Sequence, residues 1–339
     1  MNTTLLWSEL FVAALIILLA SNFLTKSADV IALKTGLGRS FVGVVMLATA
    51  TSLPEMGTGI SSVSIVGTPD LAMGAAFGSN LFNLLIIAIL DIFWRNGSIL
   101  SSINGSSITV CIFSIGIIIV AAIAIGFHQL TSVLSNWYLS PFSIILAILF
   151  LWAIYKLYIA NRNVHVSEDQ NGLDNNNYAE YSVRKAFTVY LTAATVVVVT
   201  AIWLAQIGDD LATAMEWKAS FVGTQFLALI TSLPELATSF AALRLNAPEL
   251  AITNLLGSNL FNMTFVLLID DIAYTKGVVW AGISSIHAIT AIIAIAMTFV
   301  VLFSLMTQPR RRISKYLTYE TCLLTLLYIF GSFIIFILA

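Results

Sequence analysis

A five-residue stretch, Thr-Ser-Leu-Pro-Glu, occurs twice in this chain of 339 residues, at 51–55 and at 231–235. Each copy places a proline and a carboxylate inside an apolar run. A second shared motif, Gly-Ser-Asn-Leu-Phe-Asn, follows each copy, at 78–83 and 257–262. Proline inside a helix removes one backbone donor and clashes one turn back, so each copy should break a helix and free carbonyl oxygens. Two matched breaks of this kind constrain the fold more than any other feature of the sequence.

The apolar runs around these motifs indicate a membrane protein. Hydrophobic residues make up 59% of the chain and charged residues only 9%, whereas about 25% of residues are charged in soluble proteins. A transmembrane helix needs about 20 mostly apolar residues. We therefore predict an all-α integral membrane protein with ten transmembrane helices. The predicted spans are 5–25, 41–66, 71–92, 106–126, 139–160, 186–207, 220–243, 248–270, 277–305 and 317–338.

The two halves match over a longer stretch than the motifs alone. Residues 23–43 align without a gap with 203–223, and both segments end in Ser-Phe-Val-Gly. Because each half holds five predicted spans, an odd number, the second half should enter the membrane upside down relative to the first. The predicted domains are a first five-helix repeat, a linker loop and a second, inverted five-helix repeat, at 1–160, 161–185 and 186–339.

The basic residues predict the orientation in the membrane. With ten spans, the fifteen Lys and Arg divide thirteen to two, and only Lys218 and Lys276 fall on the minor side. Lys and Arg are enriched in cytoplasmic loops. We therefore expect a multi-pass protein of the plasma membrane with a cytoplasmic linker and both termini outside. The thirteen residues are Lys26, Lys34, Arg39, Arg95, Lys156, Arg162, Arg184, Lys185, Arg244, Arg310, Arg311, Arg312 and Lys315.

The motifs supply hard oxygen ligands at helical spacing. In each pentapeptide the threonine lies four residues and the serine three residues before the glutamate, so the side chains share one helix face. Ca²⁺ takes about 6 to 8 oxygen ligands, and Glu55 and Glu235 together would neutralise one Ca²⁺. A carboxylate at the bilayer centre costs on the order of 3 kcal/mol and usually faces a site or cavity. An ion site is therefore favoured over a pair of structural kinks with hydrogen-bonded glutamates.

Other asparagine and histidine residues in the spans leave their roles open. Asn80, Asn254 and Asn259 could either bridge two helices or contact an ion, and the sequence does not decide between these roles. His287 lies outside both motifs and is interpreted as a packing residue.

The remaining acids of the spans are interpreted as structural. Asp70 and Glu249 each follow a proline at a helix start, where a carboxylate suits the helix dipole. Asp91, Asp270 and Asp271 end spans and are interpreted as marking the membrane interface.

Taken together, these motifs resemble the cation/calcium antiporter family, in particular its sodium/calcium exchanger branch. The resemblance rests on both copies of both motifs, their spacing and the five-plus-five arrangement, and is strong over 41–92 and 220–270. It implies alternating access, in which sodium entry drives calcium out through one shared set of sites. Calcium and sodium would be the transported ions. No cofactor, nucleic acid or obligate protein partner is expected.

The resemblance also implies a set of ion ligands. The central ligands would be Glu55 and Glu235, with Thr51 and Thr231. The outer sodium sites would use four serines and two backbone carbonyls, and two asparagines would face the centre. These residues are Ser52, Ser79, Ser232 and Ser258, the carbonyls of Ala48 and Ala228, and Asn83 and Asn262.

Two departures from the family pattern stand out. Ala50 and Ile230 occupy positions where members usually have glycine, and a bulkier residue there would tighten helix contact. Asn262 is an amide where potassium-dependent relatives carry an acid, which argues against potassium co-transport. The nearest rival is a calcium/proton antiporter that uses the same two glutamates. An ion channel is less favoured because the repeat is inverted within one chain, and the chain lacks the motifs of an intramembrane enzyme.

Overall fold

The fold is described from a computed structural model, over residues 3–34, 49–94, 97–103, 106–134, 137–162, 182–308, 313–314 and 317–338. These residues form helices and turns without a strand. Within them, seven helices are long and apolar enough to cross a membrane, or eight if the bent pair Ala219–Thr231 and Leu233–Arg244 is one span. The chain is an all-helical, multi-pass membrane protein.

The first half contains five main helical segments, three of which begin at or just before a proline. Proline is favoured in the first helical turn because its missing N–H would have no helical partner there. The segments are α1 (Thr3–Lys34), α3 (Leu53–Ser61) with the π-helix η2 (Ser62–Val66), α4 (Pro69–Phe93) with the short 3₁₀ helix η3 (Ile99–Ser102), α5 (Ser106–Leu130) and α6 (Pro141–Arg162).

The second half repeats this order. Its segments are α8 (Val183–Met215), the run α9 (Ala219–Val222), η5 (Gly223–Leu227) and α10 (Ala228–Thr231), then α11 (Leu233–Arg244), α12 (Pro248–Phe261) with η6 (Asn262–Val266) and α13 (Leu267–Ala273), η7 (Val279–Ala281), α14 (Ile286–Thr307) and α15 (Tyr319–Leu338).

Every predicted span overlaps one of these helical segments, with one large boundary error. The ninth span, predicted from residue 277, begins at Ile286. Residues 274–285 instead form turns around η7, and the Asp271 carboxylate accepts a hydrogen bond of 2.8 Å from the Val279 amide. The loop therefore folds back onto the end of α13 before the next helix starts. The first part of the second span, 41–48, lies outside the described residues.

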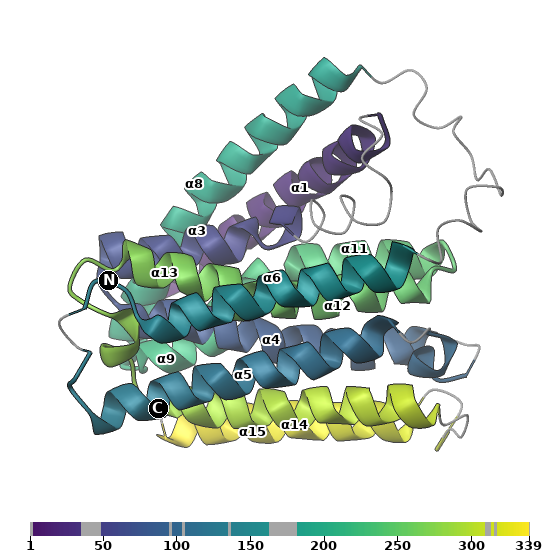
Figure 1. Ribbon diagram of the computed structural model, residues 1–339. Coiled ribbons are helices and arrows are strands. Elements are labelled where there is room, and N and C mark those ends of the chain that lie inside the picture. The colour runs from purple at the N-terminus through teal and green to yellow at the C-terminus, as the bar shows by residue number, and fades with distance from the viewer. Residues whose placement is uncertain are drawn as a thin grey trace.

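The long helices divide into an oblique pair and a bundle. α1 and α8 pack along each other and lie at an angle to the other long helices, which run side by side, and the two chain ends lie at the same end of the fold (Figure 1). Near that end Trp7 of α1 makes an edge contact with Phe226 of η5, with ring centroids 5.3 Å apart. Trp217 stacks on Phe226 at 5.4 Å, so the aromatic rings join the pair to the bundle.

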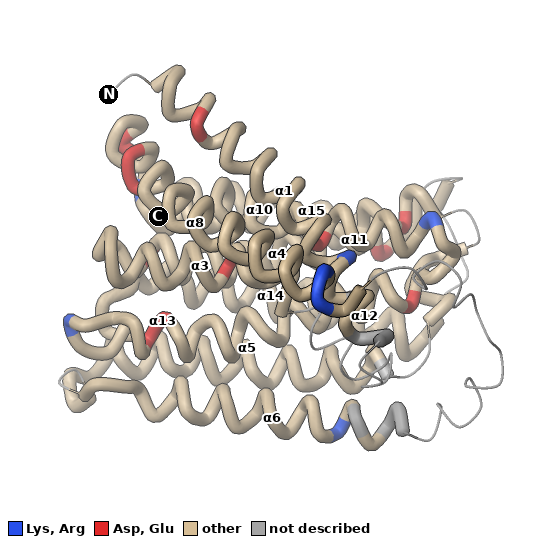
Figure 2. Tube along the Cα trace, turned by 90° about the horizontal axis from the view of Figure 1, so that it is seen from above, with Lys and Arg blue, Asp and Glu red and all other residues tan. Residues whose placement is uncertain are grey.

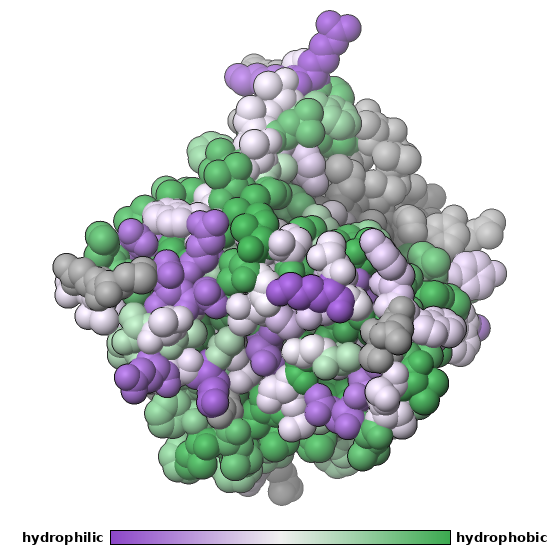
Figure 3. Space-filling model, turned by 90° about the vertical axis from the view of Figure 1, so that its left-hand side faces the viewer, coloured by the Kyte–Doolittle hydropathy of each residue, from purple (hydrophilic) through white to green (hydrophobic). Residues whose placement is uncertain are grey.

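The positions of charged and apolar residues on the surface fit a protein that spans a bilayer. Among the described residues, most Lys and Arg positions lie toward one end of the bundle, while the other end also carries basic positions, one of them beside α13 (Figure 2). The end face seen in Figure 3 carries hydrophilic residues across its middle and apolar residues around much of its edge. The flanks carry exposed apolar side chains such as Phe11, Ile148 and Phe333, as expected for surfaces that contact lipid.

α4 is the buried centre of the bundle, and a glycine sets how closely it is packed. A Cβ on Gly78 would lie 2.3 Å from the Thr224 carbonyl oxygen and 2.7 Å from the Ala228 Cβ. Only glycine permits this contact between α4 and the η5–α10 run, because any side chain would push the helices apart. The next residue, Ser79, is thereby brought beside Thr231.

Two buried aspartates tie the halves together in a reciprocal way. Asp91, at the end of α4, accepts hydrogen bonds from the Ile99 amide and from the hydroxyls of Thr318 and Thr321 at the start of α15. Asp271, at the end of α13, accepts hydrogen bonds from the Val279 amide and from the Ser140 amide and Ser143 hydroxyl at the start of α6. Each half therefore caps the last helix of the other half.

This finding corrects our interpretation of these acids as interface markers. Asp91, Asp270 and Asp271 are 3%, 0% and 0% exposed, so all three are buried inside the protein. Asp70 lies in the first turn of α4, as expected, and has a further role. Its carboxylate accepts hydrogen bonds from the Ser284 amide (2.7 Å) and lies 2.9 Å from His287 Nε2, so it ties α4 to the start of α14 and gives His287 a polar partner.

A π-helical turn keeps the two halves in register. Glu55 and Glu235 each precede their capping aspartate by 36 positions. The spacing from the glutamate to the last motif asparagine is nevertheless 28 positions in the first half and 27 in the second. After Asn262 the second half contains one residue more than the first. The π-helical turn η6 accommodates it, because such a turn holds one residue more than an α-helical turn. Asp271 is consequently the counterpart of Asp91.

Candidate ion-binding site

Both pentapeptides break their helices at the same residue. Ser52 and Ser232 leave the helical conformation with φ/ψ of −91°/7° and −88°/5°. α3 and α11 then start at the following leucine, and the prolines occupy their first turn. In the second half the helices on either side of the break are bent by 40°. The predicted pair of proline breaks is confirmed, and the two breaks have nearly identical geometry.

The glutamates after the breaks are fully enclosed. Glu55 is 1% exposed and Glu235 is 0% exposed. The hydroxyl and amide side chains predicted to accompany them are all buried as well. They are Thr51, Ser52, Ser79, Asn83, Thr231, Ser232, Ser258 and Asn262.

Hydroxyl pairs join the two halves at this point. The Thr51 hydroxyl lies 3.4 Å from that of Ser258, and the Thr231 hydroxyl lies 3.3 Å from that of Ser79. These two contacts are counterparts, because Thr51 matches Thr231 and Ser79 matches Ser258 in the repeat. The structure therefore brings the four motif segments together, although they are far apart in the sequence.

The two carboxylates differ in how they are held. Glu55 Oε1 accepts hydrogen bonds of 3.3 Å from the hydroxyls of Ser79 and Ser232. Neither oxygen of Glu235 accepts a hydrogen bond among the described residues, although the hydroxyls of Thr51 and Ser258 lie near it. Glu55 Oε2 is also without a hydrogen-bond partner in the described part of the chain. Three buried carboxylate oxygens thus remain open to a ligand.

Asparagines form a second polar layer across the halves. Asn83 Nδ2 donates to Asn259 Oδ1 at 2.9 Å, and Asn259 Nδ2 donates to the Asn80 carbonyl oxygen at 3.2 Å. Asn259 therefore bridges α12 and α4. Asn254 similarly bridges to α11 through Thr238. The Asn80 and Asn262 side chains have no hydrogen-bond partner among the described residues, so their amide groups stay available to an ion.

The predicted carbonyl ligands are less clearly placed. Ala228 is buried, but its oxygen accepts hydrogen bonds from the Ser232 amide and the Thr231 hydroxyl, at 3.1 and 3.3 Å. It already has partners within its own helix. Its counterpart Ala48 lies outside the described residues. The ligand role of both carbonyls stays a prediction.

The chemistry of this cluster is that of a hard-cation site. It combines two carboxylates with hydroxyl and amide oxygens, which suit Ca²⁺ and similar ions. Within the described residues no group of three or more His, Cys, Asp or Glu side chains is placed to hold a metal ion. Asp270, which the sequence analysis did not place in the site, is also buried without a hydrogen-bond partner among the described residues. The signal that could have found it is a charge inside an apolar run.

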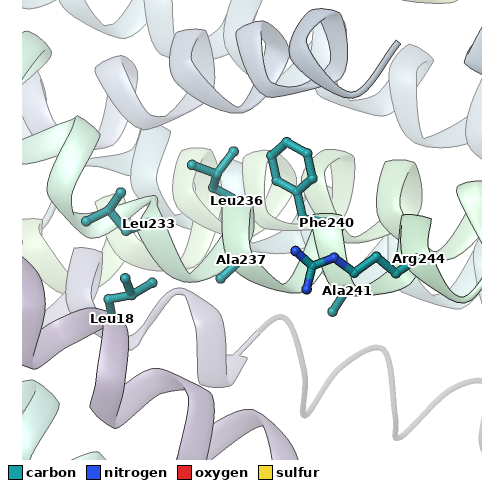
Figure 4. A pocket seen from close by; sticks show the side chains of 7 residues that line it. All are labelled: Leu18, Leu233, Leu236, Ala237, Phe240, Ala241 and Arg244. Atoms are coloured by element: carbon teal, nitrogen blue, oxygen red, sulfur yellow. The ribbon is translucent and has the colours of Figure 1, made fainter. Parts of the chain in front are cut away.

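A separate groove lies on the other side of α11 from Glu235. It has a volume of about 370 Å³ and is lined by Leu18 of α1 and by six residues of α11, namely Leu233, Leu236, Ala237, Phe240, Ala241 and Arg244 (Figure 4). These α11 residues recur at three- and four-residue spacing and so share one helix face. Its lining of six apolar side chains and the cationic Arg244 does not suit a cation, and the groove is not part of the carboxylate cluster.

Comparison with known proteins identifies relatives over most of the chain. A family model described as sodium/calcium exchanger protein matches residues 5–159 and 185–338. The inner membrane protein YrbG of Escherichia coli K12 is 25% identical over 284 residues, covering 79% of this chain and 82% of YrbG. The putative antiporter CaxA of Alkalimonas amylolytica is 35% identical over 72 residues, which cover 21% of this chain and 22% of CaxA.

Solved structures share the fold. Structures of the sodium-calcium exchanger NCX_Mj include one that aligns with a TM-score of 0.59 at 18% identity, covering 97% of this chain and 98% of that protein. The structure of YfkE aligns with a TM-score of 0.66 at 17% identity, covering 97% of this chain and 92% of YfkE.

Proposed function

Because the chain belongs to the sodium/calcium exchanger protein family, we propose that it exchanges sodium for calcium across the membrane by alternating access. It is a cation/calcium antiporter by family, and that family comprises transporters rather than enzymes. The finer assignment, sodium as the counter-ion and one shared site for both ions, is our proposal.

One observation carries the proposal. Two buried glutamates from opposite halves lie in a single cluster of hydroxyl and amide groups, and three of their four carboxylate oxygens have no hydrogen-bond partner among the described residues. Buried charges are normally paired or bound to a cation. With both glutamates ionised, one Ca²⁺ or two Na⁺ would neutralise the cluster. The two ions would then compete for the same negative charge, as exchange requires.

The proposed ligands are those expected from the sequence. Glu55 and Glu235 would be the central ligands, and the threonine and serine hydroxyls would complete the shell. The reciprocal contacts Thr51–Ser258 and Thr231–Ser79 support this set, because they place matching residues of the two halves around the carboxylates. Asn83 and Asn262 would supply amide oxygens.

The architecture that we propose is ten transmembrane helices arranged as two inverted five-helix repeats. The matched breaks at Ser52 and Ser232 and the reciprocal caps at Asp91 and Asp271 support it. Transporters of this kind bind ions between the repeats near the bilayer midplane, where broken helices line the site. We further propose that the protein lies in the plasma membrane with both termini outside.

Sodium is favoured over the proton by the oxygen groups around the carboxylates. A proton could bind either glutamate without additional ligands, whereas sodium needs several oxygens around it. The cluster offers these as the hydroxyls of Thr51, Ser52, Thr231 and Ser232 and those of the downstream serines, all of them buried. A calcium/proton antiporter that uses the same glutamates is the alternative.

Calcium efflux from proteoliposomes would test the function. Vesicles loaded with calcium at equal pH inside and outside should release it when sodium is added outside. Choline in place of sodium should give no release, and a protonophore should not abolish sodium-driven release. Release that needs a pH gradient and ignores sodium would assign the protein to the proton alternative. Release into choline medium without any gradient would indicate a channel.

A further inference from the structure

Asp270 is a carboxylate that the proposed ion site does not use. Because Asp271 is the counterpart of Asp91, the residue that matches Asp270 in the first half is Leu90. Leu90 is a fully buried apolar side chain. The second half thus places a carboxylate where the first half has a leucine, and general helix capping does not account for it.

The described residues around Asp270 pack tightly and give its carboxylate no hydrogen-bond partner. Its exposed fraction is 0%, and neither carboxylate oxygen has a hydrogen-bond partner among the described residues. A Cβ on Gly59 of α3 would lie 2.4 Å from Oδ1 and 2.6 Å from Oδ2. Both oxygens are therefore packed against the glycine, and any larger residue at position 59 would displace the carboxyl group.

Gly59 relates Asp270 to the proposed ion site. Glu55 precedes Gly59 by four residues in α3. Residues four apart in a helix lie on the same face, with Cβ positions about 5–6 Å apart. The Asp270 carboxyl group thus contacts α3 about one helical turn beyond Glu55, on the side of the fold where α13 ends.

None of the described charged groups around α13 neutralises the negative charge that Asp270 carries when it is ionised. Asp271 is itself acidic and is occupied by Ser140, Ser143 and Val279. Lys276 Nζ lies beside Gly67, beyond η2. Among the elements packed against α13, titratable residues lie on α3, on α4 and at the far end of α6. These residues are Glu55, Asp70 (which is bound to His287), Asp91, Tyr155 and Lys156. His128 of α5 interacts electrostatically with Asp271.

A buried carboxylate without a counter-ion is costly when ionised. A sodium ion at Asp270 would need several further oxygen ligands, whereas neither carboxylate oxygen has a hydrogen-bonding neighbour among the described residues. A proton needs only the carboxylate. Proton binding is therefore the chemistry that this position suits.

We propose that Asp270 binds a proton when the protein is closed and releases it to water when the end of the fold beside α13 opens, so that protons control exchange at the neighbouring ion site. The control of exchange rests on the function proposed above, whereas proton binding by Asp270 does not. Ionised Asp270 would place an extra negative charge one turn from Glu55 and retain a cation there. Exchange should therefore slow as pH rises.

Infrared spectroscopy of the purified full-length protein tests proton binding directly. With calcium bound, the wild type should show a carboxylic-acid carbonyl band that shifts in D₂O. Asp270→Asn and Asp270→Leu should both lack it, and the leucine variant copies the residue found at position 90. Asp70→Asn, which neutralises an aspartate with hydrogen-bond partners, should keep the band. Retention of the whole acid signal in both position-270 variants would overturn the proposal.

Calcium exchange measured across a pH series at constant sodium tests the control of transport. Wild-type flux should fall on the alkaline side, approaching about tenfold per pH unit beyond the midpoint if one proton is involved. In Asp270→Leu this alkaline decline should disappear, whatever its flux at acid pH. An unchanged decline in the variant would refute the control of exchange. If the protein exchanges no calcium at all, the proposed function fails, and the infrared result still decides whether Asp270 binds a proton.

Discussion

Replacing Glu235 by glutamine should weaken calcium binding strongly without destabilising the fold. Glu235 is fully buried, and neither of its oxygens accepts a hydrogen bond among the described residues. In the ion-free protein its negative charge would be uncompensated, at a cost on the order of 3 kcal/mol. Glutamine has the same shape and no charge, so the ion-free variant should be as stable as the wild type or more stable.

The loss of calcium affinity can be worked out from the same geometry. With one carboxylate left, one positive charge of Ca²⁺ stays unneutralised in a buried site. Removing one partner of a buried charge pair costs about 3–5 kcal/mol. At about 1.4 kcal/mol for each factor of ten, calcium should bind about 100- to 4,000-fold more weakly.

Glu55→Gln provides an informative comparison. Glu55 Oε1 accepts two hydrogen bonds, from Ser79 and Ser232, so its charge is partly compensated already. The variant should lose calcium affinity to the same extent as Glu235→Gln and gain less stability. Because both carboxylates bind one ion, the double variant should bind scarcely more weakly than either single variant, since such effects are not additive for residues in one network.

Isothermal calorimetry with calcium and thermal unfolding in a chelator would measure both effects on purified protein. Glu249→Gln is the matched control, because it removes a glutamate from the first turn of α12, outside the carboxylate cluster. It should bind calcium as the wild type does. Calcium affinity of Glu235→Gln within tenfold of the wild type would remove this residue from the site. A lower unfolding temperature in chelator would refute the argument about its uncompensated charge.

Three further predictions concern topology, ion selectivity and packing. In a variant without native cysteines, a cysteine introduced at Gly172 should be protected from impermeant reagents in intact cells, and labelling from outside would reverse the orientation. Because Asn262 is an amide, sodium-driven calcium flux should proceed without potassium, and an absolute potassium requirement would contradict this. Asp271→Ala leaves the amides of Ser140 and Val279 without their acceptor, so it should lower the free energy of unfolding by about 2–6 kcal/mol. Denaturant unfolding measures this change, and a loss below about 1 kcal/mol would show that the cap is unimportant.

The sequence predicted those features that depend on local chemistry. The proline breaks, the burial of both glutamates and the position of most helices follow from residue type and period. The ninth span was misplaced because residues 277–285 are apolar enough to resemble a helix, while their actual course is set by a hydrogen bond from Val279 to Asp271. A contact of this kind depends on tertiary structure and leaves no periodic signal.

The roles of the aspartates could not be read from the sequence for a similar reason. Asp91, Asp270 and Asp271 look alike at the ends of apolar runs. Only the folded chain shows that Asp91 and Asp271 cap helices, while Asp270 has no such partner in the described part of the chain. The π-helical turn η6 decides which residue takes which role, and its one-residue shift is invisible without the backbone. In the same way, the motifs predicted a shared cluster but not its specific hydroxyl pairs.

The reciprocal aspartate caps also impose a waiting time on the growing chain. Ser140 precedes Asp271 by 131 residues, and Asp91 precedes Thr318 by 227. At a synthesis rate of about 5–20 residues per second, α6 waits about 7–26 s for its cap, and Asp91 waits about 11–45 s for its partner threonines. During these intervals the start of α6 and the Asp91 carboxylate would be inserted into the membrane without their hydrogen-bond partners. Ribosome pausing between the halves would prolong this stage, because the start of α6 gains its hydrogen-bond acceptor only when Asp271 has been synthesised.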